Sequence, residues 1–450
     1  MTRFHSPSAG PMRTAALCGI LLATVAAPGA RAIDLIGVYQ LALSGDPVYQ
    51  AAGATNRAAQ EVRPQARALL LPNVNAGADV SRNFLDVRES NSFSRAGTDE
   101  FNSEAYALSL TQPVFRRDLF IQLGQAENRI NQADAEYGFA LQGLMLRTAE
   151  RYFDVLRAED ELTFARSALE AFEQQLKQSQ QRFEVGLIAI TDVEEAQAGF
   201  DLARAQVIAA ENALDVAREA LRELTGEYHF DLDGLGNRFL LVTPDPDSID
   251  RWTETALEQN LGLSASRFSS DVARDEIRRQ SAGHLPTVDI VSSIGRDEST
   301  GGAAGGSTLE QAAIGLQLNV PIYQGGLIVS RTREARELYQ LSLDRLEEQR
   351  RAVHRQTRDA YLGVISGISL VQALEQAVRS TESAKAAIEA GFQVGTRTSV
   401  DVLDAERDLF EAKRNLAASR YNYIVNTLSL KQAAGTLSQE DLRIINGWLQ

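Results

Sequence analysis

Four stretches of the chain alternate hydrophobic and polar residues, which is the pattern of a half-exposed β-strand. They lie near residues 73–84, 106–111, 288–294 and 314–320. The alternating runs contain 6 to 12 residues, close to the length of about ten residues of a tilted strand in a membrane barrel. The pattern therefore predicts one amphipathic hairpin in each half of the chain.

Most of the remaining sequence repeats apolar and small residues every seven positions, which is typical of coiled-coil helices. The repeat runs through residues 162–183 and 193–221, and again through 371–392 and 402–430. No proline occurs between residue 114 and residue 243. Residues 115–183 are therefore predicted to form one helix, about 100 Å long at ~1.5 Å per residue.

The two halves of the chain repeat one another. Phe183, Val185, Gly186, Asp192, Val193 and Ala196 recur in the same spacing as Phe392, Val394, Gly395, Asp401, Val402 and Ala405. We predict an internal duplication with repeats at residues 33–243 and 244–450. The halves differ in length within the polar stretches 88–100 and 297–308, which are predicted as surface loops.

The N-terminus has the pattern of a secretory signal peptide, predicted at residues 1–32. Arg3 and Arg13 precede an apolar run, and Ala30-Arg31-Ala32 supplies small residues for cleavage. Cys18, the single cysteine, lies in this segment. The exported chain would therefore contain neither a disulfide framework nor a cysteine metal site.

Composition narrows the possible functions further. The formal net charge of −15 disfavours binding to nucleic acid. After the signal peptide no uninterrupted apolar run reaches about 18 residues, so no transmembrane helix is predicted. His229, His284 and His354 are scattered, and neither a catalytic triad nor metal-ligand spacing is present. We predict no enzymatic activity, no cofactor and no metal.

Four strands cannot close a membrane barrel, because the smallest such barrels have about eight. The chain would therefore have to oligomerise, with two copies giving eight strands and three giving twelve. Two alternatives stay open. Two soluble hairpins packed on a helix would give the same alternation, and a soluble periplasmic coiled-coil adaptor or scaffold would explain the heptads without using the hairpins.

Three motifs of the sequence are specific: "RFEVGLIAITDV", "VGTRTSVDVLDAE" and "ASRYNYIVNTLSLKQAAGTL". With them, the sequence resembles the TolC family of outer-membrane channel proteins over essentially the whole chain after residue 32. The resemblance implies a homotrimer with a twelve-stranded barrel in the outer-membrane lipid, continued by a twelve-helix barrel in the periplasm. Such ducts serve tripartite efflux pumps and type I secretion systems. They work with a periplasmic adaptor and an inner-membrane transporter of the efflux or ABC secretion type.

Two turns are the first candidate site. Gly186 and Gly395 each end a long helix, and an acidic residue near the start of the next helix suits its dipole. Thr191 and Glu194 have the spacing of a capping box. The resemblance adds a role in contacting the adaptor, for Val185, Gly186, Leu187, Val394, Gly395 and Thr396. Ordinary helix termination explains the same residues.

The second candidate site is acidic. Asp401 and Asp404 are three residues apart, and so lie on one helical face. The resemblance implies that they form rings at the narrowest point of the duct, where they would bind a multivalent cation. It also implies a latch between Arg397 and the region of Asp192. At the position of Phe392 the family can carry a tyrosine whose hydroxyl joins the latch. Phenylalanine has no hydroxyl, so this position departs from the family. The alternative is that both aspartates are ordinary acidic residues on the solvent-exposed surface.

Overall fold

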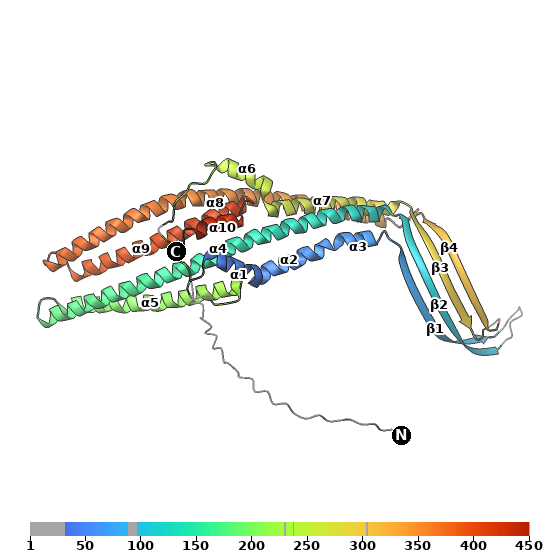
Figure 1. Cartoon of the computed structure of the whole chain (residues 1–450), viewed down its shortest axis with the longest axis horizontal. Helices are drawn as coiled ribbons and strands as arrows, with labels where there is room; N and C mark the ends of the chain where they lie inside the picture. The colour runs from blue at the N-terminus through green and yellow to red at the C-terminus, as the bar shows by residue number, and fades with distance from the viewer. Residues whose placement is uncertain (1–31, 89–96, 229–230, 237, 303–304, 450) are drawn as a thin grey trace, which may run out of the picture.

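The computed structural model describes the chain except residues 1–31, 89–96, 229–230, 237, 303–304 and 450. All but the last residue of the predicted signal peptide therefore lies outside the described residues. Long helices lead from a β-sheet at one end of the molecule to two helical hairpins at the other (Figure 1). The elements follow the same order in both halves of the chain: short helices, a β-hairpin and two long helices.

The sheet is antiparallel with the strand order β1-β2-β3-β4. Its strands are β1 (Asn73–Val87), β2 (Gly97–Phe115), β3 (Thr287–Ser299) and β4 (Ser307–Asn319). Pairing sets Val74 opposite Leu110 and Ala76 opposite Leu108. Residues that face each other across an antiparallel pair point to the same side. The predicted alternation therefore becomes one apolar face of the sheet.

The strands are longer than the sequence patterns predicted. Strands β1 to β4 contain 15, 19, 13 and 13 residues. The predicted loops at 88–100 and 297–308 were thus too wide, since β2 begins at Gly97 and β3 continues to Ser299. Cross-strand pairs of charged residues explain the extension, because Arg82 contacts Glu100 at 2.8 Å and Arg296 contacts Glu310 at 3.5 Å. Such pairs stabilise a strand that carries no apolar alternation.

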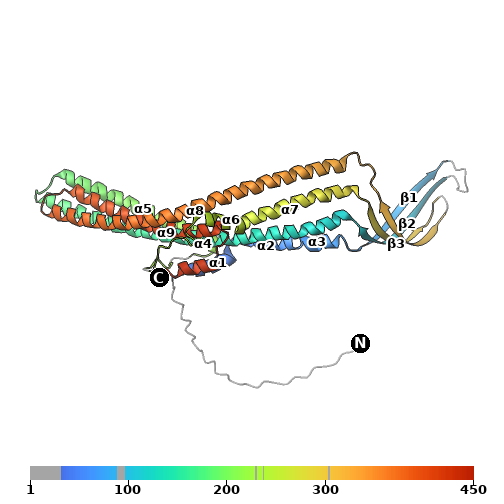
Figure 2. The ribbon, with the colours of Figure 1, turned by 90° about the horizontal axis from the view of Figure 1, so that it is seen from above.

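Helices from both halves of the chain lie side by side next to the sheet (Figure 2). Helices α2 (Pro47–Gln60) and α3 (Val62–Ala68) pack on α4 (Arg117–Glu184), and α7 (Leu261–Ser281) packs between α4 and α8 (Leu327–Gln393). A short 3-10 helix, η1 (Ala282–His284), leads from α7 into β3. Along the chain, α3 and α7 therefore lead into the sheet, and α4 and α8 lead out of it.

The two longest helices continue past this region into hairpins. Helix α4 (Arg117–Glu184) has 68 residues and turns into α5 (Ile190–Thr225). Helix α8 (Leu327–Gln393) has 67 residues and turns into α9 (Ser399–Ala433). The single long helix predicted over residues 115–183 is confirmed, except that Phe115 still pairs with Val288 as a strand residue.

The hydrophobic core lies at the middle of the molecule, where the hairpins meet the shorter helices α1 (Leu35–Gly45), α6 (Ile249–Gln259) and α10 (Gln439–Asn446). Two tyrosines at equivalent places in the halves tie connecting segments to it. The Tyr152 hydroxyl donates to Asp233 O at 2.7 Å, and the Tyr361 hydroxyl to Asp247 Oδ1 at 2.7 Å.

One described helix, α8, has the length and the composition to cross a membrane, with a stretch of mean hydropathy 1.2. Only 17% of that stretch is buried within the chain. Helix α8 packs against α7 along one part of its length and against α9 along another. We therefore interpret the stretch as part of the packed long helices and not as a membrane span.

Candidate functional site at the hairpin tips

The first tip is a tight turn between α4 and α5. Gly186 has a φ of 75°, in the left-handed region that side chains with a Cβ rarely adopt. Its N–H donates to Phe183 O at 2.8 Å, and the Leu187 N–H donates to Arg182 O at 2.8 Å. These bonds satisfy carbonyls at the end of α4, as a glycine-ended helix requires.

The second tip repeats this geometry between α8 and α9. Gly395 has a φ of 79°, and its N–H donates to Phe392 O at 3.2 Å. Thr396 donates to Gly391 O twice, from its N–H at 2.9 Å and from its hydroxyl at 3.1 Å. Both tips lie at the end of the molecule remote from the sheet (Figures 1 and 2).

The helices after the turns begin with different caps. At α9 the Asp401 N–H donates to the Thr398 hydroxyl at 3.2 Å, and Asp401 Oδ2 accepts from the Thr398 N–H at 2.8 Å. This is a complete capping box. At α5 the carboxylate of Asp192 accepts from the Ala189 N–H at 3.2 Å. The predicted box of Thr191 and Glu194 was wrong, because α5 already begins at Ile190.

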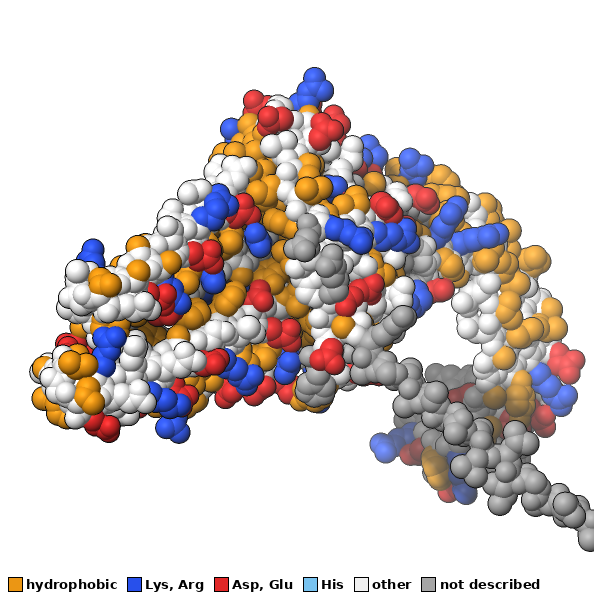
Figure 3. All heavy atoms as spheres, turned by 60° about the vertical axis from the view of Figure 1, so that its left-hand side comes forward, with side chains coloured by type: hydrophobic (Ala, Val, Ile, Leu, Met, Phe, Trp, Pro, Cys, Tyr) orange, Lys and Arg blue, Asp and Glu red, His pale blue; other side chains and the backbone are white. Residues whose placement is uncertain are grey.

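Apolar side chains project into solvent at both turns. Val185 is 68% exposed, Leu187 is 73% exposed and Val394 is 75% exposed. Figure 3, in which the tips come forward, shows hydrophobic side chains at the ends of both hairpins. Exposed apolar groups on a tight turn are suited to a protein contact.

The predicted acidic residues lie together on α9, but within one chain each is paired locally. Asp401 Oδ1 lies 3.9 Å from Arg397 Nη1, and Asp404 Oδ1 lies 3.0 Å from Arg407 Nη1. Hydrogen bonds from the Thr398 N–H and hydroxyl lower the pKa of the Asp401 carboxyl. Among the ion pairs of the described residues, Arg397 has Asp401 as its partner; the latch with Asp192 stays a prediction.

Both halves of the chain, each with its tip, match a known protein family. The model of the family described as "Outer membrane efflux protein" matches residues 38–227 and 252–436, so both halves match and each match contains one tip. The chain belongs to the outer membrane efflux protein family. It is therefore an outer-membrane protein, which decides against the soluble adaptor or scaffold alternative.

Curated relatives agree with this family assignment. The chain is 40% identical over 422 residues to the outer membrane protein TolC of Vibrio cholerae, covering 93% of this chain and 94% of that protein. It is 31% identical to the alkaline protease secretion protein AprF of Pseudomonas aeruginosa, covering 92% and 87%. The crystal structure of the Campylobacter jejuni CmeC outer membrane channel has the same fold, with a TM-score of 0.80 at 15% identity over 92% of this chain and 90% of that one.

The structure of this efflux protein adds site residues that the sequence patterns did not single out. The Arg182 guanidinium lies 4.3 Å from the centre of the Phe392 ring, across the two hairpins. Gln175 Nε2 donates to the Ser399 hydroxyl at 2.9 Å, and both side chains are buried. The heptad pattern places Phe392 in a seam but gives no sign of the arginine, because the two residues are far apart in sequence.

An ion pair between α8 and α9 is the most important contact that the sequence patterns did not predict. Lys385 Nζ of α8 lies 2.6 Å from Glu406 Oε1 of α9, and the Glu406 side chain is 9% exposed. Burial would lower the pKa of Lys385, but contacts with Glu406 and Glu389 leave it raised. Lys385 occupies a heptad position that is expected to be apolar, and this break in the pattern was the available signal.

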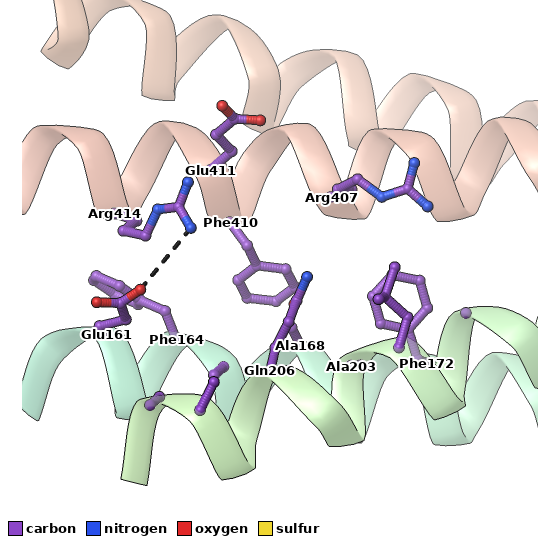
Figure 4. A pocket seen from close by; sticks show the side chains of 15 residues that line it. Glu161, Phe164, Ala168, Phe172, Ala203, Gln206, Arg407, Phe410, Glu411 and Arg414 are labelled. Atoms are coloured by element: carbon purple, nitrogen blue, oxygen red, sulfur yellow. Dashed lines mark ion pairs between the residues drawn. The ribbon is translucent and has the colours of Figure 1, made fainter. Parts of the chain in front are cut away.

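Closer to the core, α9 also contacts α4 and α5 (Figure 4). Phe410 of α9 points toward α4 and α5, near Phe164 and Phe172, and Arg414 lies 4.0 Å from Glu161. A cavity of about 270 Å³ remains among these side chains. The cluster of buried side chains at this contact is much smaller than the core at the middle of the molecule.

Proposed function

We propose that this efflux protein is a passive outer-membrane exit duct, used in efflux and in type I secretion. Two matches to the family model, with a sheet at one end and exposed tips at the other, are the observations that carry the proposal. The duct supplies no energy of its own, since the exported molecule would be driven by its transporter. The similarity to AprF, which is named for protease secretion, supports the secretion role.

The working form would be a homotrimer of twelve strands and twelve helices. One sheet has two open edges, β1 and β4, and open edges are not tolerated in lipid. Ring closure by three copies removes them. The chain would then work with a periplasmic adaptor and an inner-membrane transporter of the efflux or ABC secretion type.

The adaptor would bind the two turns. Val185, Leu187 and Val394 provide apolar contact area, and Gly186 and Gly395 set the shape of the backbone that presents them. Three chains would offer six such turns in one ring. Repeated shallow contacts of this kind gain affinity through multivalency.

The gate would lie on the second hairpin. Three copies of Asp401 and of Asp404 would form two rings that bind a multivalent cation and close the pore. Arg397 and Asp192 would hold the hairpins together in the closed state. The distance of 3.9 Å between Arg397 Nη1 and Asp401 Oδ1 is long for an ion pair, so the arginine would leave Asp401 readily and pair with Asp192 when the gate closes.

Export in the organism of origin tests the function. Deleting the gene should raise sensitivity to hydrophobic drugs and abolish secretion of a protein that lacks a cleavable leader. Restoring the gene should restore both. Normal drug resistance together with normal secretion in the deletion strain would contradict the duct proposal.

Planar bilayers test the gate. A trivalent cation added at the tip side should block the wild-type channel, and Asp401→Asn with Asp404→Asn should abolish the block. Asp201→Asn, which removes an exposed acid from α5, is the matched control and should keep it. Arg397→Asp should raise the conductance, and Asp192→Arg should restore closure in the double variant. Block that survives in the double asparagine variant would rule out the rings.

A further inference from the structure

Helix α8 begins with exposed arginines that no carboxylate neutralises. Arg333 and Arg336 are both exposed, and in the part of the chain that the structure describes neither forms an ion pair or a side-chain hydrogen bond. Glu337 follows Arg333 by one helical turn, but it lies further from the sheet and no ion pair joins the two. The two arginines therefore keep their charge for a partner outside the chain.

The length of the sheet places these arginines at the level of lipid head groups. Strands β3 and β4 contain 13 residues each. At ~3.4 Å per residue and a tilt of ~45° they span about 30 Å, which is the thickness of the hydrocarbon core. Arg333 lies six residues after the first residue of α8, about 9 Å along the helix. Side chains on a helix lean toward its N-terminus, which here is the end next to the sheet, so the long arginine stems can reach back to the phosphates.

The surface of the chain changes from apolar to basic in this region. The segment between β4 and α8 exposes Ile322 and Tyr323, by 92% and 86%. On α8, Val329, Arg333 and Arg336 are spaced by four and three residues and so share one face. Val329, the residue of this face nearest to the sheet, is 43% exposed. An apolar surface that is followed by an aromatic and then by basic residues is typical of a membrane boundary.

This face of α8 is the outer face of the layer of long helices. Arg336 is 18 residues, or five helical turns, before His354. His354 lines a hollow together with Asp250 and Glu254 of α6, so α6 covers the face that carries Arg336. A ring of helices can hold an added helix only on its outside, since the inside is the passage. This step rests on the proposed duct.

Arg331 provides the contrast on the same helix. It is 18 residues before Gln349, which lines a different hollow with Gln132 of α4 and Gly262 of α7. Gln349 and His354 are five residues apart, and thus ~140° apart around the helix. Arg331 therefore faces the interior, although it is only two residues from Arg333.

The other end of the apolar face of the sheet carries the opposite charge. There Arg82 pairs with Glu100 at 2.8 Å, and Arg296 lies 3.0 Å from Glu298 and 3.5 Å from Glu310. These arginines already have carboxylate partners, and the acids are in excess. The charge that is available to a lipid phosphate thus lies at the helical end.

We propose that Arg333 and Arg336 bind the phosphate head groups of anionic phospholipids in the periplasmic leaflet of the outer membrane. A guanidinium group binds phosphate through paired hydrogen bonds. Near a membrane surface each arginine favours anionic lipid by about five-fold. The bound lipids fix the depth at which the sheet gives way to the helices. This contact lies outside the passage and is separate from the gate and from the adaptor.

Lipid binding by the full-length protein tests this surface. The protein is reconstituted in vesicles with equal amounts of phosphatidylglycerol and phosphatidylethanolamine and extracted in mild detergent, and the retained lipids are measured by mass spectrometry. The wild type should retain phosphatidylglycerol in excess. Arg333→Gln with Arg336→Gln should lower this excess by about five-fold or more, and lysine at both positions should keep most of it. Arg331→Gln, on the interior face of the same helix, is the matched control and should leave the excess unchanged.

The outcomes separate the lipid surface from the duct. Equal retention of the two lipids by the wild type, or an equal loss in Arg331→Gln, would overturn the surface and leave the duct standing. Excess inorganic phosphate should not displace the lipid, because the apolar face of the sheet holds its acyl chains. Full displacement would show that the arginines bind free anions, and would also overturn the surface. A wild type that forms no channel in planar bilayers, yet loses its phosphatidylglycerol in the double glutamine variant, would overturn the duct and keep the surface.

Discussion

The two tip hairpins have turns of the same geometry but seams of different chemistry. In the first hairpin, equivalent seam positions carry Leu176 and Gln197, whereas in the second they carry the ion pair of Lys385 and Glu406. Phe183 of the first hairpin is 42% exposed, but its counterpart Phe392 is 8% exposed. The two hairpins therefore share the turn that is presented and differ in the packing behind it.

This difference assigns different tasks to the hairpins. A buried ion pair contributes little net stability, because desolvation offsets the attraction, but it penalises any arrangement that separates the charges. The ion pair thus fixes the register between α8 and α9 but adds little to the stability of their contact. Such a hairpin is suited to moving as one body, and it carries all three residues proposed for the gate on α9 and its turn: Arg397, Asp401 and Asp404.

The largest expected effect comes from breaking that pair. Lys385→Leu should destabilise the α8/α9 hairpin by about 3 kcal/mol, because Glu406 is left buried and uncompensated. Adding Glu406→Gln copies the first hairpin and should recover most of the loss. Hydrogen exchange of amides in α8 and α9 of the full-length protein measures both. Equal exchange in the single and double variants would show that the pair is not coupled.

Alanine at the two turn glycines should have equal effects. Gly186→Ala and Gly395→Ala each place a Cβ on a residue with positive φ, which costs about 1–2 kcal/mol. Nothing lies within 4 Å of either added Cβ, so the backbone alone sets the cost. Exchange of amides in the turns measures it. An effect twice as large at one tip would show that the turns are not equivalent.

The helix caps should give a smaller effect, of opposite sign in the two hairpins. Thr398→Ala removes the hydroxyl that accepts from the Asp401 N–H and should weaken the start of α9 by about 1 kcal/mol. Ala189→Thr gives α5 the cap of its counterpart and should strengthen its start by a similar amount. Exchange in the first turn of each helix reports the change. No protection gained by Ala189→Thr would mean that the cap depends on more than these two residues.

Much of the fold could be predicted, because it depends on local patterns. The period of two gave the hairpins, the heptads and the lack of proline gave the long helices, and the two glycines gave the turns. Strand ends were predicted less well, because pairing with a neighbour extends β2 to Phe115 although Pro113 interrupts the alternation. A β-bulge at this proline makes the extension possible.

The site was predictable only where its residues are near in sequence. The spacing of Asp401 and Asp404 predicts that they share one helix face, whereas Arg397 was singled out only by the resemblance to the TolC family, and the gate role of all three stays a prediction. Arg182 over Phe392, Gln175 with Ser399, and Lys385 with Glu406 all join different helices. Such contacts depend on how the hairpins pack, which the spacing of residues along the chain does not give.

Acid should loosen the second tip through Asp401. Its carboxyl has a pKa below the usual value in the folded protein because Thr398 donates two hydrogen bonds to it, from its N–H and from its hydroxyl. The stabilisation is therefore present above the unfolded pKa of about 4 and is lost as the pH falls through the lower folded value. A spin label at Val400→Cys, on the first turn of α9, should become more mobile as the pH falls below about 4. Asp401→Asn should remove this pH dependence, because an amide does not titrate. A label whose mobility still changes in the asparagine variant would assign the transition to another carboxylate of the tip.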